Sequence, residues 1–276
     1  MRRSMGGRRA IPLREHHELD LQPAMRNCLA MKGFDTSSLW RVSAFRRAGR
    51  EGQLDVGRPE DRLTVLPTTL LADLRRLQTD GAGGDVLEVV AACLRNHESA
   101  LLYLELGAHV WPVTLLPCES LYHSPHDALS EGLAMAELRV LSVEPPGVRA
   151  PGASMSERVA SVDRYRPLAG LLWVLAVNGP RRDLLPELSG RVAYRLVSSG
   201  KTALPETRGA MASAVLRLEH QSVPLRDIAG WPGMSVERAS RLLNALYLNG
   251  VLLVSRSHPA ARDAPSRWRG LFARRR

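Results

Sequence analysis

Residues 223–255 read VPLRDIAGWPGMSVERASRLLNALYLNGVLLVS, and this stretch decides the fold of the C-terminal part of the chain. A first helical segment ends at Trp231-Pro232-Gly233, because proline cannot continue a helical hydrogen-bond ladder and glycine tolerates a reversal. Ser235 then supplies an N-cap, and Asn249-Gly250 closes a longer helix. The buried stripe of that helix recurs at helical spacing, in Val236, Ala239, Leu242, Leu243, Leu246 and Tyr247. The apolar run 251–254 predicts a short buried strand.

This order of helix, turn, helix and strand resembles the winged helix-turn-helix superfamily of bacterial regulators, over about the last third of the chain. The resemblance implies a second helix at 223–230, a recognition helix at 235–249 and a preceding helix near 206–219. Three polar residues project from the expected recognition helix, opposite its apolar stripe: Arg238, Arg241 and Asn244. Their spacing predicts contacts to base edges or phosphates.

The rest of the chain predicts an α+β fold with two domains. Residues 21–145 form an N-terminal mixed α/β domain, a Pro/Gly-rich linker occupies 146–160, and 161–255 form a mainly helical, winged-helix-like domain. A basic arm at 1–20 and a basic tail at 256–276 are predicted to be disordered, since they have little to bury.

Several elements are predicted within these domains. We expect strands at 39–45 and 63–66, and helices at 69–77 and 86–96, the latter capped by Asp85 with Glu88 at the capping-box position. An antiparallel hairpin is expected from 100–106 and 109–116, with Pro112 moving its second strand to an edge or a bulge. Further expected elements are a strand at 138–143, a helix at 168–177, a short helical turn at 184–188, and a strand at 192–197 that could pair with 251–254.

Charge is distributed unevenly along a chain whose formal net charge is +10. The first fourteen residues contain five arginines and no acid, and 256–276 contain seven arginines against Asp263. The segment 160–255 is also basic, whereas 15–159 are acidic on balance. A nucleic-acid-binding C-terminal half shows such asymmetry, although solvated tails do as well.

Cysteine usage and hydropathy bear on the compartment. The cysteines are Cys28, Cys93 and Cys118, an odd and scattered set that indicates a reducing compartment and no disulfide framework. No apolar run approaches the length of a bilayer span, and no hydrophobic region follows the basic start. We therefore expect a cytoplasmic protein with no transmembrane segment.

We predict no catalytic residues, no metal site and no cofactor. The sequence lacks a GxSxG elbow, an HExxH motif and a complete phosphate-binding loop at Gly200-Lys201-Thr202. Cys118, His123 and His126 are the one metal-like cluster, but a structural zinc site needs four defined ligands.

Two hypotheses for function follow. In the first, the chain is a non-enzymatic regulator that binds DNA, with Arg238, Arg241 and Asn244 on the duplex and Arg256, Arg267 and Arg269 adding phosphate contacts. In the second, it is an adaptor for a protein partner, and its winged helix does not touch DNA. The basic C-terminal half and the segregation of charge favour the first, whereas the lack of a second strand pattern after Ser255 and the carboxylate of Glu237 beside the arginines favour the second. The sequence leaves the oligomeric state open.

Overall fold

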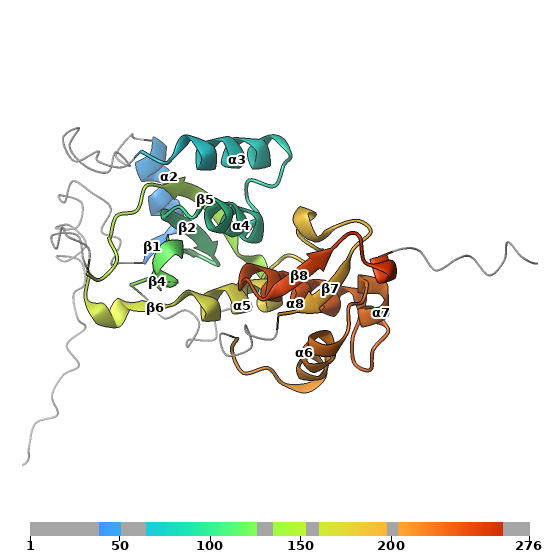
Figure 1. Ribbon diagram of the computed structural model, residues 1–276. Coiled ribbons are helices and arrows are strands. Elements are labelled where there is room, and N and C mark those ends of the chain that lie inside the picture. Colours follow the sequence, from blue (N-terminus) through green and yellow to red (C-terminus); the bar gives the residue numbers. More distant parts are fainter. Residues whose placement is uncertain (1–38, 51–64, 126–134, 153–159, 198–203, 262–276) are drawn as a thin grey trace, which may run out of the picture.

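A computed structural model describes residues 39–50, 65–125, 135–152, 160–197 and 204–261 of the chain (Figure 1). It contains both helices and antiparallel sheets, which confirms the α+β class. The predicted basic arm at 1–20 and the tail beyond residue 261 lie outside the described residues.

The structure holds a six-stranded sheet, a two-stranded sheet and the helices around them. The helices are α2 (Val42–Arg50), α3 (Thr68–Thr79), α4 (Val86–Asn96), α5 (Leu168–Asn178), α6 (Gly209–His220), α7 (Leu225–Ala229) and α8 (Val236–Leu248). The strands are β1 (Trp40–Arg41), β2 (Ala100–Leu106), β3 (His109–Leu116), β4 (Leu121–His123), β5 (Arg139–Glu144), β6 (Tyr165–Pro167), β7 (Ala193–Leu196) and β8 (Leu252–Ser255).

Helix α4 and the hairpin that follows it form as the sequence predicts. The Asp85 carboxylate caps α4 by accepting hydrogen bonds from the backbone N–H groups of Leu87, at 2.9 Å, and Glu88, at 3.3 Å. The strands β2 and β3 pair antiparallel from Leu106 opposite His109 to Ala100 opposite Leu115. Helix α4 buries eight of its residues, and most of them belong to the main hydrophobic core with the sheet. These elements are predictable because their capping, periodicity and turn signals all lie within about thirty residues.

The predicted strand at 39–45 is wrong beyond its first residues. Only Trp40 and Arg41 pair as β1, and the chain turns into α2 at Val42. Val42, Phe45 and Ala48 then follow helical spacing and join a small second core on the sheet. The ring of Phe45 lies 4.9 Å from that of Tyr103, centroid to centroid. Packing against the sheet therefore overrides the apparent strand pattern. The second predicted strand, at 63–66, is not confirmed at its described residues, 65 and 66, which lie outside any helix or strand.

Pro112 does not move β3 to an edge, contrary to the sequence prediction. Strand β3 is central, with β2 on one side and both β1 and β4 on the other. On that second side, β1 pairs with residues 109–110 and β4 with residues 114–116. Pro112 therefore stands in the gap between two partner strands, where a missing N–H group breaks no ladder bond.

Strand β6 ties the C-terminal half of the chain to the N-terminal sheet. Although it lies beyond the predicted linker, it pairs antiparallel with β4, and Tyr122 stands opposite Arg166. Helix α5 follows directly and packs against α8. One continuous hydrophobic core extends from α3 and α4 through α5 to α8. The division into domains at 146–160 stays a prediction, but residues 165–167 complete the N-terminal sheet.

The C-terminal elements form three helices around a small sheet. As predicted, β7 pairs antiparallel with β8, with Arg195 opposite Leu253. Tyr194 also exchanges two backbone hydrogen bonds with Val223, at 2.8 and 3.0 Å, so β7 lies between Val223 and β8. Figure 1 shows α8 beside this small sheet.

A partly buried ion cluster fastens the loop after α5 to the start of α4. The guanidinium of Arg181 lies 2.7 Å from a carboxylate oxygen of Asp85 and 2.8 Å from one of Glu88. It also donates to the backbone carbonyls of Asp183, at 3.0 Å, and Leu184, at 2.6 Å. The side chain of Glu88 is only 6% exposed, so its charge is compensated by Arg181 rather than by water.

We expect Arg181→Ala to lower the free energy of unfolding by about 3 kcal/mol, because the substitution leaves the buried Glu88 carboxylate without its partner. The matched control is Arg208→Ala, whose side chain is 85% exposed beside Glu206 and should change stability by less than about 0.5 kcal/mol. Urea unfolding followed by circular dichroism measures both. Equal stability of the two variants would show that the ion cluster does not hold the halves together.

Candidate nucleic-acid interface

The turn between α7 and α8 has the backbone geometry that its sequence predicts. Gly233 has φ +74°, and a Cβ atom at this position would lie 2.8 Å from Cβ of Ala210 in α6. Any other residue would therefore be strained and would push α6 away. The hydroxyl of Ser235 accepts a hydrogen bond from the backbone N–H of Arg238 at 3.2 Å, which confirms the N-cap. At the other end, Gly250 has φ +69°, and the N–H of Val251 donates to the carbonyl of Leu246.

Asn244, predicted to contact DNA, is fully buried, with 0% of its surface exposed. Its side-chain oxygen accepts from the backbone N–H of Leu185 at 2.9 Å, and its amide nitrogen donates to the carbonyl of Asp183 at 2.9 Å. The side chain of Asn244 therefore supplies hydrogen-bond partners to the backbone of the loop after α5. The structure contradicts the prediction, because helix α5 and this loop cover the face of α8 that the sequence pattern assigned to solvent.

Arg241, also predicted to contact DNA, is held within the protein. Its side chain is 15% exposed. One nitrogen contacts the carboxylate of Glu237 at 3.1 Å, and another donates to the backbone carbonyl of Val177 near the end of α5. That carbonyl belongs to the last turn of α5, where helix carbonyls lack partners within the helix. Arg241 thus joins α8 to α5, and as placed it is not available to a duplex.

Arg238 remains at the surface, at the exposed start of α8. Its guanidinium donates to the carbonyl of Gly233 at 2.7 Å, so it lies over the turn. Two arginines that the sequence reasoning missed lie nearby. Arg217 of α6 is 5.3 Å from the ring centroid of Trp231, and Arg182, 73% exposed, lies 3.9 Å from the carboxylate of Glu237. Only the tertiary fold brings Arg217 to Trp231 of the turn and Arg182 to the first turn of α8, which follows it.

The other predicted phosphate contacts lie apart from this turn or outside the described residues. Arg256 is exposed after β8 and donates to the carbonyls of Ser189, at 3.4 Å, and Glu187, at 3.3 Å. Arg267 and Arg269 fall in the part of the tail that is not described. We define the basic turn as Arg182, Arg217, Arg238 and Trp231. Of the six residues that the sequence predicts to contact nucleic acid, Arg238 alone belongs to it.

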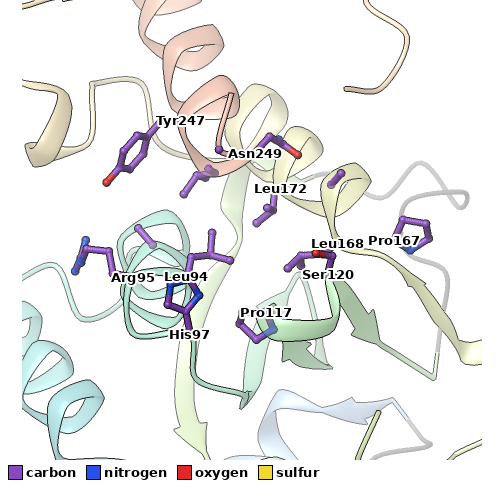
Figure 2. Close-up of a pocket in the computed structure, with 14 residues that line it drawn as sticks. Leu94, Arg95, His97, Pro117, Ser120, Pro167, Leu168, Leu172, Tyr247 and Asn249 are labelled. Atoms are coloured by element: carbon purple, nitrogen blue, oxygen red, sulfur yellow. The ribbon is translucent and has the colours of Figure 1, made fainter. Parts of the chain in front are cut away.

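A groove lies at the junction of α4, α5 and the end of α8 (Figure 2). Its volume is about 630 Å³, and its lining is mainly apolar, with Leu94, Leu168 and Leu172 among the lining residues. Arg95 also lines it, but its guanidinium is 3.2 Å from Asp73 and also contacts Glu187. Since Arg95 is already paired twice, the groove offers an apolar surface with little free charge.

The metal-like cluster does not assemble among the described residues. Cys118 is exposed, and its thiol lies 3.3 Å from the carbonyl of His97, whereas His123 is 2% exposed within β4. His126 lies outside the described residues. The described part of the chain holds no group of three or more His, Cys, Asp or Glu side chains placed to bind a metal ion. Nor does any described helix have both the length and the apolarity to cross a membrane.

His123 is buried between neighbouring strands, opposite Thr114 of β3 and Tyr165 of β6. Its Nε2 atom is buried and has no hydrogen-bond partner among the described residues, and its ring lies 5.2 Å from that of Tyr165. Burial, helped by the positive charges of Arg164 and Arg166, lowers the pKa of His123 to about 4. His123 is therefore neutral in the folded protein near pH 7.

We expect Asn244→Ala to lower the free energy of unfolding by about 1–3 kcal/mol, because it removes the acceptor of the buried Leu185 N–H group and one of the two donors to the Asp183 carbonyl. Arg238→Ala is the control from the same helix and should change stability by less than about 0.5 kcal/mol. Chemical unfolding distinguishes the two. An Asn244→Ala protein as stable as the natural chain would mean that these two hydrogen bonds do not stabilise the loop.

The depressed pKa of His123 predicts a pH dependence of stability. The unfolded chain, with a histidine pKa of about 6.5, binds this proton more readily than the folded chain does. Stability should therefore fall as the pH drops from about 6.5 toward 4, by up to about 1.4 kcal/mol for each unit of pKa difference. Urea unfolding of the natural chain and of His123→Gln, at several pH values, separates the contribution of His123 to the pH dependence of stability. Identical pH dependence of the two proteins would contradict it.

No protein-family model matches this chain, and no curated protein or solved structure is significantly similar to it. A conclusion about function therefore depends on the contacts and charges of this chain alone.

Proposed function

We propose that this chain is a non-enzymatic, cytoplasmic regulatory protein that binds the backbone of nucleic acids through the basic turn of a winged-helix-like unit, residues 161–255. The observation that carries the proposal is the convergence of Arg217 and Arg238 on the exposed turn at Trp231–Gly233. Arginine presents a planar fork of donors that matches the geometry of phosphate oxygens.

The electrostatics of α8 support an anion at its start. A helix N-terminus carries a partial positive charge, and Val236 in the first turn is 60% exposed, so this end is open. Glu237 is the unfavourable group there, but its carboxylate lies beside both Arg241 and Arg182. The local charge around the turn thus remains positive.

A recognition helix reads base edges with side chains along its length. In the contact proposed here, α8 does not read bases in this way. Contacts to phosphates fix the position of a protein on a duplex, whereas sequence is read by side chains that reach base edges. The middle of α8 has its Arg241 and Asn244 side chains engaged with α5 and the loop after it. We therefore propose backbone binding of low sequence specificity, in which the end of α8 approaches the nucleic acid.

The small sheet supports the likeness to a winged helix. After Ser255 the sequence shows no pattern for a second wing strand, yet β8 has a strand partner in β7. Strand β7 precedes the three helices in sequence and lies between β8 and Val223. We propose that β7 takes the place of the missing wing strand.

An adaptor for a protein partner is the second candidate function. The engagement of Arg241 and Asn244 within the molecule favours it, because this pairing makes α8 a packing element. The apolar groove beside the end of α8 is a surface suited to a protein segment. In this case the basic turn would be solvated and would have no nucleic-acid ligand.

Binding to mixed duplex DNA across a salt series tests the proposal. We expect Arg182→Ala/Arg217→Ala/Arg238→Ala to weaken binding and to lower the slope of log K against log salt by about 1 for each lost phosphate contact. The matched control removes three exposed arginines from the N-terminal half, Arg75, Arg76 and Arg139, and should leave the slope unchanged. Binding of DNA by a chain that ends at Ala261 measures how much of the affinity the basic tail contributes.

Two results would contradict the nucleic-acid proposal. One is no binding at low salt. The other is binding that disappears in the shortened chain but persists in the triple variant, which would trace it to the tail alone. Either result favours the adaptor.

A further inference from the structure

The outer edge of the two-stranded sheet is defined by the direction of its hydrogen bonds. Tyr194 directs its N–H and C=O toward Val223, so its neighbours on β7 face β8. Consistently, the N–H of Val197 donates to the carbonyl of Val251 at 2.8 Å. Because backbone groups alternate along an antiparallel strand, Leu253 and Ser255 face β7, whereas Leu252 and Val254 direct their N–H and C=O groups away from it.

This edge is neither paired nor protected in the part of the chain that the structure describes. The sheet ends at β8 in that part, and the strand reads Leu-Leu-Val-Ser. Natural edge strands are usually blunted by lysine, proline or a bulge, and none occurs here. The side chain of Leu253, in the middle of the strand, is 53% exposed. The next charge along the strand, Arg256, turns back to carbonyls of its own chain, and Arg195, opposite Leu253, stands on β7 and not on this edge.

We propose that this edge pairs with the same edge of a second copy of the chain, antiparallel about a two-fold axis at Leu253. The two outward-facing residues flank Leu253 symmetrically. In this register Leu252 of each copy stands opposite Val254 of the other, and the two pairs form four N–H···O bonds. The two Leu253 residues then face one another as a non-hydrogen-bonded pair, in which side chains lie closest.

The symmetry of the β8 edge favours a second copy of the chain as its binding partner. An edge that is complementary to itself forms a closed isologous contact without any other partner. On association, Leu253 of each copy becomes buried, and the outward-facing backbone groups of Leu252 and Val254 become hydrogen-bonded. Because a four-residue strand buries much less than the ~1,200 Å² of a stable interface, the dimer is weak and concentration-dependent. The chains carry a net charge of +10, so salt should strengthen the dimer by screening their repulsion.

Disulfide trapping tests the register. In the full chain with Cys28→Ser and Cys118→Ser, we expect Leu253→Cys to form a covalent dimer under mild oxidation, because the Cβ atoms of a non-hydrogen-bonded pair lie near disulfide distance. The matched control is Leu216→Cys, at a leucine of α6 that is 49% exposed. We expect the Leu253→Cys protein to cross-link at least tenfold faster. Equal rates would overturn the proposal.

A second measurement does not depend on a cysteine. Sedimentation of the natural chain at rising concentration should show a dimer that is favoured by salt. Leu253→Lys, which alters only an exposed side chain and puts two like charges at the axis, should abolish it, with an unchanged circular dichroism spectrum confirming the fold. A monomer at all concentrations, or a dimer that Leu253→Lys leaves intact, would overturn the proposed interface.

Discussion

The contact of Arg181 with Asp85 and Glu88 is the interaction on which the rest of the structure depends. It joins the loop after α5 to the first turn of α4, where Asp85 is also the cap of the helix. Burial makes the contact consequential, because a carboxylate as enclosed as Glu88 is costly without a partner. A second ion pair, between Arg95 and Glu187, holds the other end of α4 to the same loop region. The loop is thereby fastened along the length of α4.

The fastened loop determines what α8 can present to a ligand. Asn244 reaches the loop backbone at Asp183 and Leu185, and Arg241 reaches the end of α5. The middle of α8 therefore belongs mainly to the interior, and its exposed residues lie in its first turn. This geometry moves the surface that could meet a nucleic acid from the side of the helix to its end, where arginines from α6, α8 and the loop converge. Among the described residues, the outer edge of β8 has no strand partner.

Local signals account for the elements that could be predicted. The bounds of α4 and of the hairpin follow from a capping aspartate, a helical apolar stripe and a glycine turn, which act within a few residues of each other. The pairing of β7 with β8 could also be foreseen from two short apolar runs. The failures have tertiary causes. Helix α2 forms because Phe45 packs on Tyr103, and Pro112 is accepted in a central strand because two partner strands leave a gap opposite it.

The sequence by itself determined the turn at Trp231-Pro232-Gly233, the extent of α8 and the uneven distribution of charge, because these depend on backbone preferences and composition. It could not determine which polar side chains of α8 are exposed. A helical pattern shows which face is apolar, but a polar face looks the same whether it meets water or a loop that needs hydrogen-bond donors and acceptors. Only the tertiary structure decided that Asn244 bonds the backbone of Asp183 and Leu185 while Arg238 stays at the surface, since that choice depends on a loop some sixty residues earlier in the chain.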